Sequence, residues 1–182
     1  MHLQTPTADT DEWDLLTTAL NQYGIRHVAP GAKPKGPLPK SEELFFHLAT
    51  SHAVRLRQAM ILMLITHPDL DADARQAIER LGGDLRTKAL YRYVAACALQ
   101  RTWRTRLATD LGPRRPIQPV YLDRLALPPL DQDAGRATLV ALSNQEEDSY
   151  RYDAWNGYTA LMDLLLSELG DPRWGKVHAG VR

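Results

Sequence analysis

The residues best suited to chemistry lie between Leu85 and Thr109, a stretch that holds six basic side chains and no acidic one. Arginine and lysine bind carboxylates and phosphates, and aromatic rings beside them can stack on bases or anchor a partner protein. Tyr91, Tyr93 and Trp103 are interleaved with the basic groups. The candidate partner- or anion-binding residues are therefore Arg86, Lys88, Arg92, Arg101, Trp103, Arg104 and Arg106.

A helical projection divides the six basic groups into two patches, because successive residues point about 100° apart. One patch continues a stripe that is apolar in the first half of the helix, so Arg101 and Arg104 would require counter-charges. Three sources are open: acidic residues of the chain itself, an anionic ligand or nucleic acid, and a partner protein. The internal candidates are Asp71, Asp73, Glu146, Glu147 and Asp148.

No catalytic or metal-binding pattern accompanies these residues. The six histidines include no H-E-x-x-H pair, and neither a G-x-S-x-G elbow nor a Gly-rich phosphate loop occurs. Cys97 is the single cysteine and is flanked by alanines, which predicts a small buried side chain rather than a nucleophile. We therefore predict no catalytic residues, no metal site and no cofactor, in a chain that is not an enzyme.

Arg173 and His178 form an R-x4-H pattern. This pattern resembles the ribonuclease motif of HEPN domains, which are an all-helical family. The resemblance implies a third alternative, an RNase that holds this pair in a groove. In this chain the pattern follows Pro172, contains Gly175 and has Trp174 where the family usually has a polar residue. These departures favour ordinary residues of a C-terminal tail.

Composition indicates which kinds of partner and which cellular compartment to expect. The chain of 182 residues has 22 basic and 22 acidic residues and a pI near 7.0, which argues against a general binder of polyanions. The N-terminus lacks the basic and apolar regions of a signal peptide, and the longest apolar run, Ala59–Ile65, is too short for a bilayer. Together with the single cysteine, these features predict a cytoplasmic protein with no membrane partner.

Hydrophobic periodicity and capping residues predict the helices that position these side chains. They cover residues 10–23, 41–49, 52–66, 71–81, 84–110, 134–142 and 144–169. Proline-rich connectors cover residues 24–40 and 113–131, and residues 171–182 form a flexible tail. The prediction is one all-α domain over residues 1–182, a bundle of six or seven helices with a long central helix; Ser41–His67 resembles a HEAT-type hairpin.

The segment Leu99–Leu107, followed by Gly112 and by Leu125–Pro128, is similar to uncharacterised all-helical bacterial proteins that accompany nucleotidyltransferase-type partners. The resemblance implies a regulatory or antitoxin-like subunit. We therefore expect a non-enzymatic helical interaction protein that binds and regulates a partner protein, in a homo- or hetero-oligomer. The alternative is a nucleic-acid-binding protein that uses the acid-free basic helix over residues 85–109.

Overall fold

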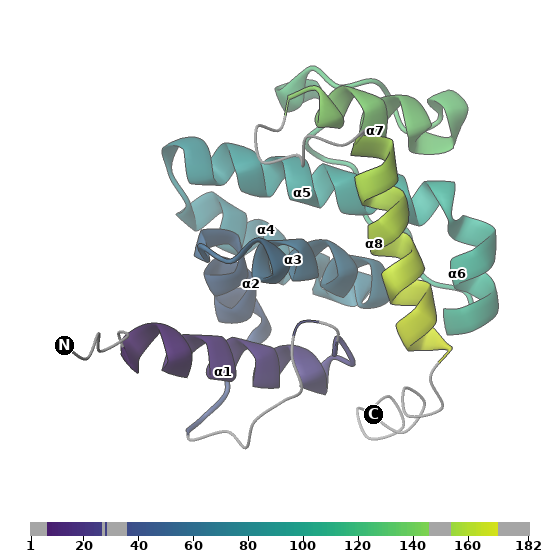
Figure 1. Ribbon diagram of the computed structural model, residues 1–182. Coiled ribbons are helices and arrows are strands. Elements are labelled where there is room, and N and C mark those ends of the chain that lie inside the picture. Colours follow the sequence, from purple (N-terminus) through teal and green to yellow (C-terminus); the bar gives the residue numbers. More distant parts are fainter. Residues whose placement is uncertain (1–6, 27, 29–35, 146–153, 171–182) are drawn as a thin grey trace.

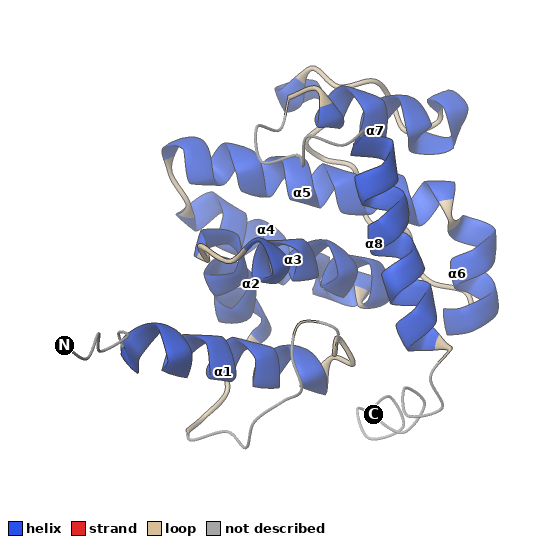
Figure 2. Cartoon of the chain, viewed as in Figure 1, coloured by secondary structure: helices blue, strands red, loops and turns tan. Residues whose placement is uncertain are grey.

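The computed structural model describes residues 7–26, 28, 36–145 and 154–170, and these residues form an all-α bundle (Figures 1 and 2). They contain eight α-helices, three 3-10 turns and no strand, which confirms the predicted fold class. The α-helices are α1 (Thr7–Gln22), α2 (Ser41–Thr50), α3 (Val54–Thr66), α4 (Asp71–Arg80), α5 (Gly83–Thr102), α6 (Arg104–Leu111), α7 (Arg136–Ser143) and α8 (Ala154–Leu169). The 3-10 turns are η1 (Pro68–Leu70), η2 (Asp123–Leu125) and η3 (Gln132–Gly135).

Helix α5 is the centre of the bundle. In Figure 1 it lies between α7 on one side and α3 with α4 on the other, and it packs against all three. Residues 92–100 are buried without exception, and several of them are alanines. Small side chains allow neighbouring elements to approach closely, and Gly135 of η3 lies directly against Ala98. The prediction of a central helix is confirmed.

Helix α3 supplies the other half of the core. The residues from Met60 to Ile65 are each at most 4% exposed, so this helix is covered by protein on every face. Helices α1, α2 and α5 all pack against it. Helices α2 and α3 form a packed pair, although α2 packs most extensively against α4. Although α3 is so apolar, neither it nor any other described helix is long and apolar enough to cross a membrane.

The predicted single helix over residues 84–110 is wrong, because the backbone leaves the helical conformation at Trp103 (φ −101°, ψ 17°). Helix α5 ends at Thr102, and α6 begins at Arg104. The Thr102 hydroxyl is shared between the carbonyl oxygens of Ala98 and Ala134, at 2.9 Å each. This contact fixes the end of α5 to η3, a segment more than 30 residues further along the chain. Tertiary packing therefore overrides a local sequence that favours continuation.

Other predicted boundaries also change. Asn144, the predicted N-cap of the last helix, is instead the residue that ends α7, and α8 is described from Ala154 onward. Residues 146–153 lie outside the described part of the chain. So do residues 27 and 29–35 of the predicted connector and residues 171–182, which include the R-x4-H pair Arg173 and His178. Within the predicted connector over residues 113–131, the Tyr121 side chain packs against the core and is 8% exposed.

Candidate functional site

The basic residues in the first half of α5 interact with other residues of the same chain. Arg86 forms an ion pair with Glu79 of α4. The Lys88 Nζ lies 3.0 Å from a carboxylate oxygen of Asp84, one helical turn earlier. Arg92 is only 4% exposed and takes part in interactions within the protein. Of the three sources of counter-charge, internal pairing therefore accounts for Arg86 and Lys88.

The second half of the basic stretch is more open. Trp103, at the joint between α5 and α6, is half-buried and packs against the core. The Arg106 Nε lies 3.2 Å from a carboxylate oxygen of Asp110, in an exposed pair within α6. Arg101 and Arg104 are exposed, and neither forms an ion pair or a side-chain hydrogen bond with any residue that the structure describes. The structure thus leaves these two of the seven predicted residues available.

The expectation that Arg101 and Arg104 lie on a core-facing stripe is wrong. The projection assumed one straight helix, whereas α5 ends one residue after Arg101 and α6 begins at Arg104. Exposed guanidinium groups are solvated and need no buried counter-charge. The predicted internal acids have other contacts or are not described: Asp71 pairs with Arg75 at 3.3 Å and Asp73 accepts a hydrogen bond from Ser41, while residues 146–148 lie outside the described segments.

Gln100 brings a later segment back to the end of α5. Its Nε2 donates to the carbonyl oxygen of Arg115 at 3.2 Å, and its Oε1 accepts from the backbone N–H of Ile117 at 2.8 Å. The chain reverses at Gly112, whose φ of +74° is readily adopted by glycine. Residues 115–117 therefore lie beside the last turn of α5.

This reversal adds two arginines to the exposed pair. Arg114 and Arg115 are both exposed, and their side chains form no ion pair or hydrogen bond with the residues described. We name Arg101, Arg104, Arg114 and Arg115 the arginine patch. Sequence reasoning missed Arg114 and Arg115 because they lie in a proline-rich segment, outside the predicted helix. Their adjacency in sequence directly after Gly112-Pro113 was the available signal.

A buried polar network lies on the inner side of α5. The Tyr93 hydroxyl contacts both the Asp71 carboxylate and the carbonyl oxygen of Gln118, the latter at 2.8 Å. The Cys97 thiol lies 3.9 Å from the same carbonyl oxygen. Burial raises the pKa of the Cys97 thiol and of the Tyr93 hydroxyl well above their ordinary values. Cys97 is therefore a buried packing residue with no thiolate character.

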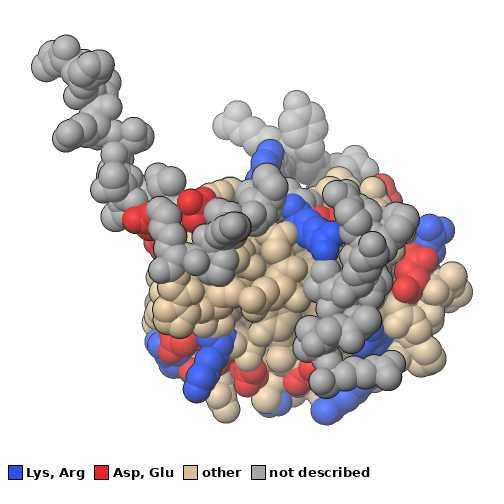
Figure 3. Space-filling model, turned by 90° about the horizontal axis from the view of Figure 1, so that it is seen from below, with Lys and Arg blue, Asp and Glu red and all other residues tan. Residues whose placement is uncertain are grey.

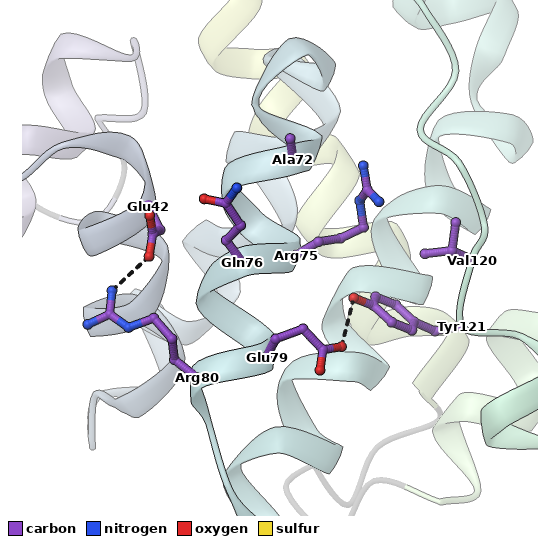
Figure 4. A pocket seen from close by; sticks show the side chains of 8 residues that line it. All are labelled: Glu42, Ala72, Arg75, Gln76, Glu79, Arg80, Val120 and Tyr121. Atoms are coloured by element: carbon purple, nitrogen blue, oxygen red, sulfur yellow. Dashed lines mark hydrogen bonds and ion pairs between the residues drawn. The ribbon is translucent and has the colours of Figure 1, made fainter.

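Glu79 lines one pocket, and its partners Arg86 and Arg124 line a second, in a place that sequence reasoning did not identify. The larger, of about 760 Å³, lies between α2, α4 and the segment that carries Val120 and Tyr121 (Figure 4). The smaller, of about 490 Å³, lies between the start of α5 and η2, and Arg86 and Arg124 line it. In Figure 4 the carboxylate of Glu79 points toward the Tyr121 hydroxyl. No sequence motif links these positions, because they come from three separate segments.

Neither the rest of the described surface nor similarity to known proteins identifies a further site. On the face shown in Figure 3, basic and acidic side chains are scattered around a broad area that carries neither. Within the described ranges, no three His, Cys, Asp or Glu residues are grouped so that they could hold a metal ion. Neither the family models, nor the curated proteins, nor the solved structures include a match to this chain.

Proposed function

We propose that this chain is a non-enzymatic interaction protein that binds and regulates a partner protein through the arginine patch. The observation that supports it is that four exposed arginines at or shortly after the end of the central helix have no acidic partner among the described residues, and that Gln100 holds the backbone of Arg115 beside that helix end. Guanidinium groups that the fold does not use can pair with carboxylates in a bidentate manner. The expected occupant is an acidic segment of another protein.

The place of the patch supports a regulatory or antitoxin-like role. Arg101 and Arg104 lie within Leu99–Leu107, the segment from which we infer a resemblance to helical proteins that accompany nucleotidyltransferase-type partners. Trp103 lies between them in sequence and is half-buried. Tryptophan and arginine are the side chains most enriched where alanine substitution weakens protein–protein complexes. A rigid helix end with both types is a suitable anchor for a partner segment.

Nucleic acid is the second candidate, because phosphates would pair with the same four arginines. Four phosphate contacts would give a slope of about −3.6 for log affinity against log salt on duplex DNA. The chain has no net charge to attract a polyanion from a distance, which favours the protein partner.

Co-purification with mass spectrometry tests the proposal. Tagged wild-type chain and the R101E/R104E variant are purified from the organism that makes the protein, with and without nuclease. We expect a stoichiometric protein partner that survives nuclease, is lost with R101E/R104E and dissociates as salt is raised. The matched control is R55E, since Arg55 is an exposed arginine on α3. A partner that R101E/R104E retains, or one released by nuclease, would contradict the proposal.

A further inference from the structure

Glu79 lies among groups that would otherwise bind an anion. One carboxylate oxygen pairs with Arg86 of α5, and the other lies 3.8 Å from an Nη of Arg124 and 3.4 Å from the Tyr121 hydroxyl, which donates to it. These partners come from α5, η2 and the segment before η2. The carboxylate of Glu79 is therefore an acceptor for donors from three directions.

Arg75 adds a third guanidinium group to this cluster. Burial raises the pKa of the Tyr121 hydroxyl, and the positive charges of Arg75, Arg86 and Arg124 oppose that rise. Arg75 lines the same pocket as Glu79 and Tyr121, while Arg86 and Arg124 pair with Glu79 directly. Figure 4 shows Arg75 of α4 in the lining of the larger pocket. One Nη of Arg75 also lies 3.3 Å from a carboxylate oxygen of Asp71.

Two N–H donors of this cluster have no hydrogen-bond acceptor among the described residues. The Nε atoms of Arg75 and Arg86 are buried and form no hydrogen bond with any described residue. An unsatisfied buried donor is costly, and a guanidinium group can offer several N–H groups in a fixed fork. Glu79 is half-exposed, so its side chain can turn out to solvent without leaving a buried charge. A stronger acceptor could then occupy its place.

We propose that this cluster is a binding site for the phosphate group of a small phosphorylated molecule, and that Glu79 occupies the phosphate position when the site is empty. Arg86, Arg124 and the Tyr121 hydroxyl then donate to the phosphate, and Arg75 stabilises its charge. The rest of the molecule extends into the larger pocket, along Gln76 and Val120. A pocket of about 760 Å³ is within the range of small-molecule sites.

Charge complementarity favours phosphate over a carboxylate. Three guanidinium groups face two carboxylates, those of Asp71 and Glu79. Asp71 is 5% exposed and remains in place, so the displacement of Glu79 leaves an excess of two positive charges. A phosphate monoester carries a charge of about −1.5 to −2 at neutral pH and matches that excess, whereas a carboxylate only replaces Glu79.

Titration calorimetry with defined probes tests the site on the full chain. The probes are inorganic phosphate, pyrophosphate, ADP and ATP, with acetate as the carboxylate control. We expect saturable binding of the phosphates, tighter for the nucleotides if the larger pocket holds their remaining groups. Nucleotides no tighter than pyrophosphate would identify the free anion as the ligand, and the proposed extension into the pocket would be wrong. No phosphate binding at millimolar concentration to wild type or E79Q would overturn the proposal.

Variants distinguish displacement of Glu79 from nonspecific attraction. E79Q should tighten binding about fivefold to tenfold, because it removes a negative charge that competes with the phosphate. R124Q, at a half-exposed position, should weaken binding by a similar factor while the fold persists. R101Q/R104Q should leave it unchanged, because Arg101 lies about 22 Å beyond Arg86 along α5 and Arg104 follows the end of that helix. Weaker binding by E79Q, or equal binding by R124Q, would overturn the site regardless of whether the protein-partner proposal holds.

Discussion

Gly135 lies so close to Ala98 that a Cβ atom at position 135 would be 3.0 Å from the Ala98 carbonyl oxygen. The same Cβ would be 3.2 Å from the Ala98 Cα, so backbone rather than a flexible side chain limits the space. Gly135 also has a φ of +87°, a conformation that disfavours side chains. Both constraints arise where η3 packs against the last turns of α5.

Gly135→Ala should therefore destabilise the fold by about 2 kcal/mol or more, through steric overlap and backbone strain together. The matched control is Gly157→Ala in α8, where no atom lies within 4 Å of the added Cβ and φ is not positive. That substitution should stabilise the helix by about 0.5–1 kcal/mol. Urea denaturation followed by circular dichroism measures the free energy of unfolding of both variants. If both substitutions changed that free energy equally, the close contact at Gly135 would be refuted.

Gln100→Ala should destabilise the protein by about 1–3 kcal/mol, because it leaves the buried N–H of Ile117 without its acceptor. It should also weaken partner binding, since Gln100 holds Arg115 beside the end of α5. Arg115→Gln keeps the backbone contact and should reduce binding without a loss of stability. Thermal melting of both variants separates the two effects, and a loss of stability in Arg115→Gln would count against this assignment.

Alanine substitutions of Arg92 and Arg101 should have very different effects on stability, although both residues belong to α5. Arg92→Ala should cost about 2 kcal/mol or more, because the side chain is 4% exposed and its packing and interactions within the protein are lost. Arg101→Ala should change stability by less than about 0.5 kcal/mol, as for most exposed positions. Chemical denaturation checks the contrast. A large loss in the Arg101 variant would mean that this side chain has a structural partner.

Stability should fall as pH drops below about 6.5, in part through His67. Burial lowers the pKa of this histidine from its ordinary value of 6.5, with Arg114 also lowering it, while the hydrogen bond to the Tyr23 carbonyl and the charge of Asp69 oppose the shift. The unfolded chain therefore binds more protons than the folded one between the two pKa values, so stability rises with pH through that window. Denaturation midpoints measured from pH 7.5 down to pH 5 test this.

His67→Gln keeps a donor for the Tyr23 carbonyl oxygen, which lies 2.9 Å from the His67 Nε2, but removes the titration. The variant should show a flatter stability profile across this window. His52→Gln is the control, because His52 is exposed. An unchanged profile in the His67 variant would assign the pH dependence to other groups.

Cys97 should resist alkylation in the folded protein. The thiol is 1% exposed and burial raises its pKa, so almost no thiolate exists at neutral pH. Iodoacetamide should label it at least a hundredfold more slowly than in urea, at a rate that follows unfolding. Rapid labelling of the native chain, measured by intact mass, would show that the inner side of α5 is accessible.

Local patterns were sufficient to predict most elements. The apolar run of α3 had no polar face, and Met60–Ile65 are indeed buried on all sides. The predicted helices over residues 52–66 and 71–81 correspond closely to α3 and α4, and Pro68 and Gly82 follow them as residues that interrupt a helix. The alanines on either side of Cys97 predicted a buried position, and the Cys97 side chain is 1% exposed.

Long-range contacts account for what the sequence did not reveal. The break at Trp103 depends on the bond from Thr102 to Ala134, and no local signal specifies that pairing. Once the helix was assumed straight, Arg101 and Arg104 were placed toward the core. The cluster around Glu79 was missed for the same reason, since Arg86 and Arg124 meet only in the folded chain.

The central position of α5 has a consequence for how the molecule opens. Helices from both ends of the described chain pack against it or against elements that contact it, so its middle turns cannot be exposed while most of the bundle stays intact. Amide hydrogens of residues 93–99 should therefore exchange with solvent only through global unfolding, while those of α1 exchange through smaller fluctuations. The bundle then has a single cooperative unit centred on one helix, with α1 as its least protected layer.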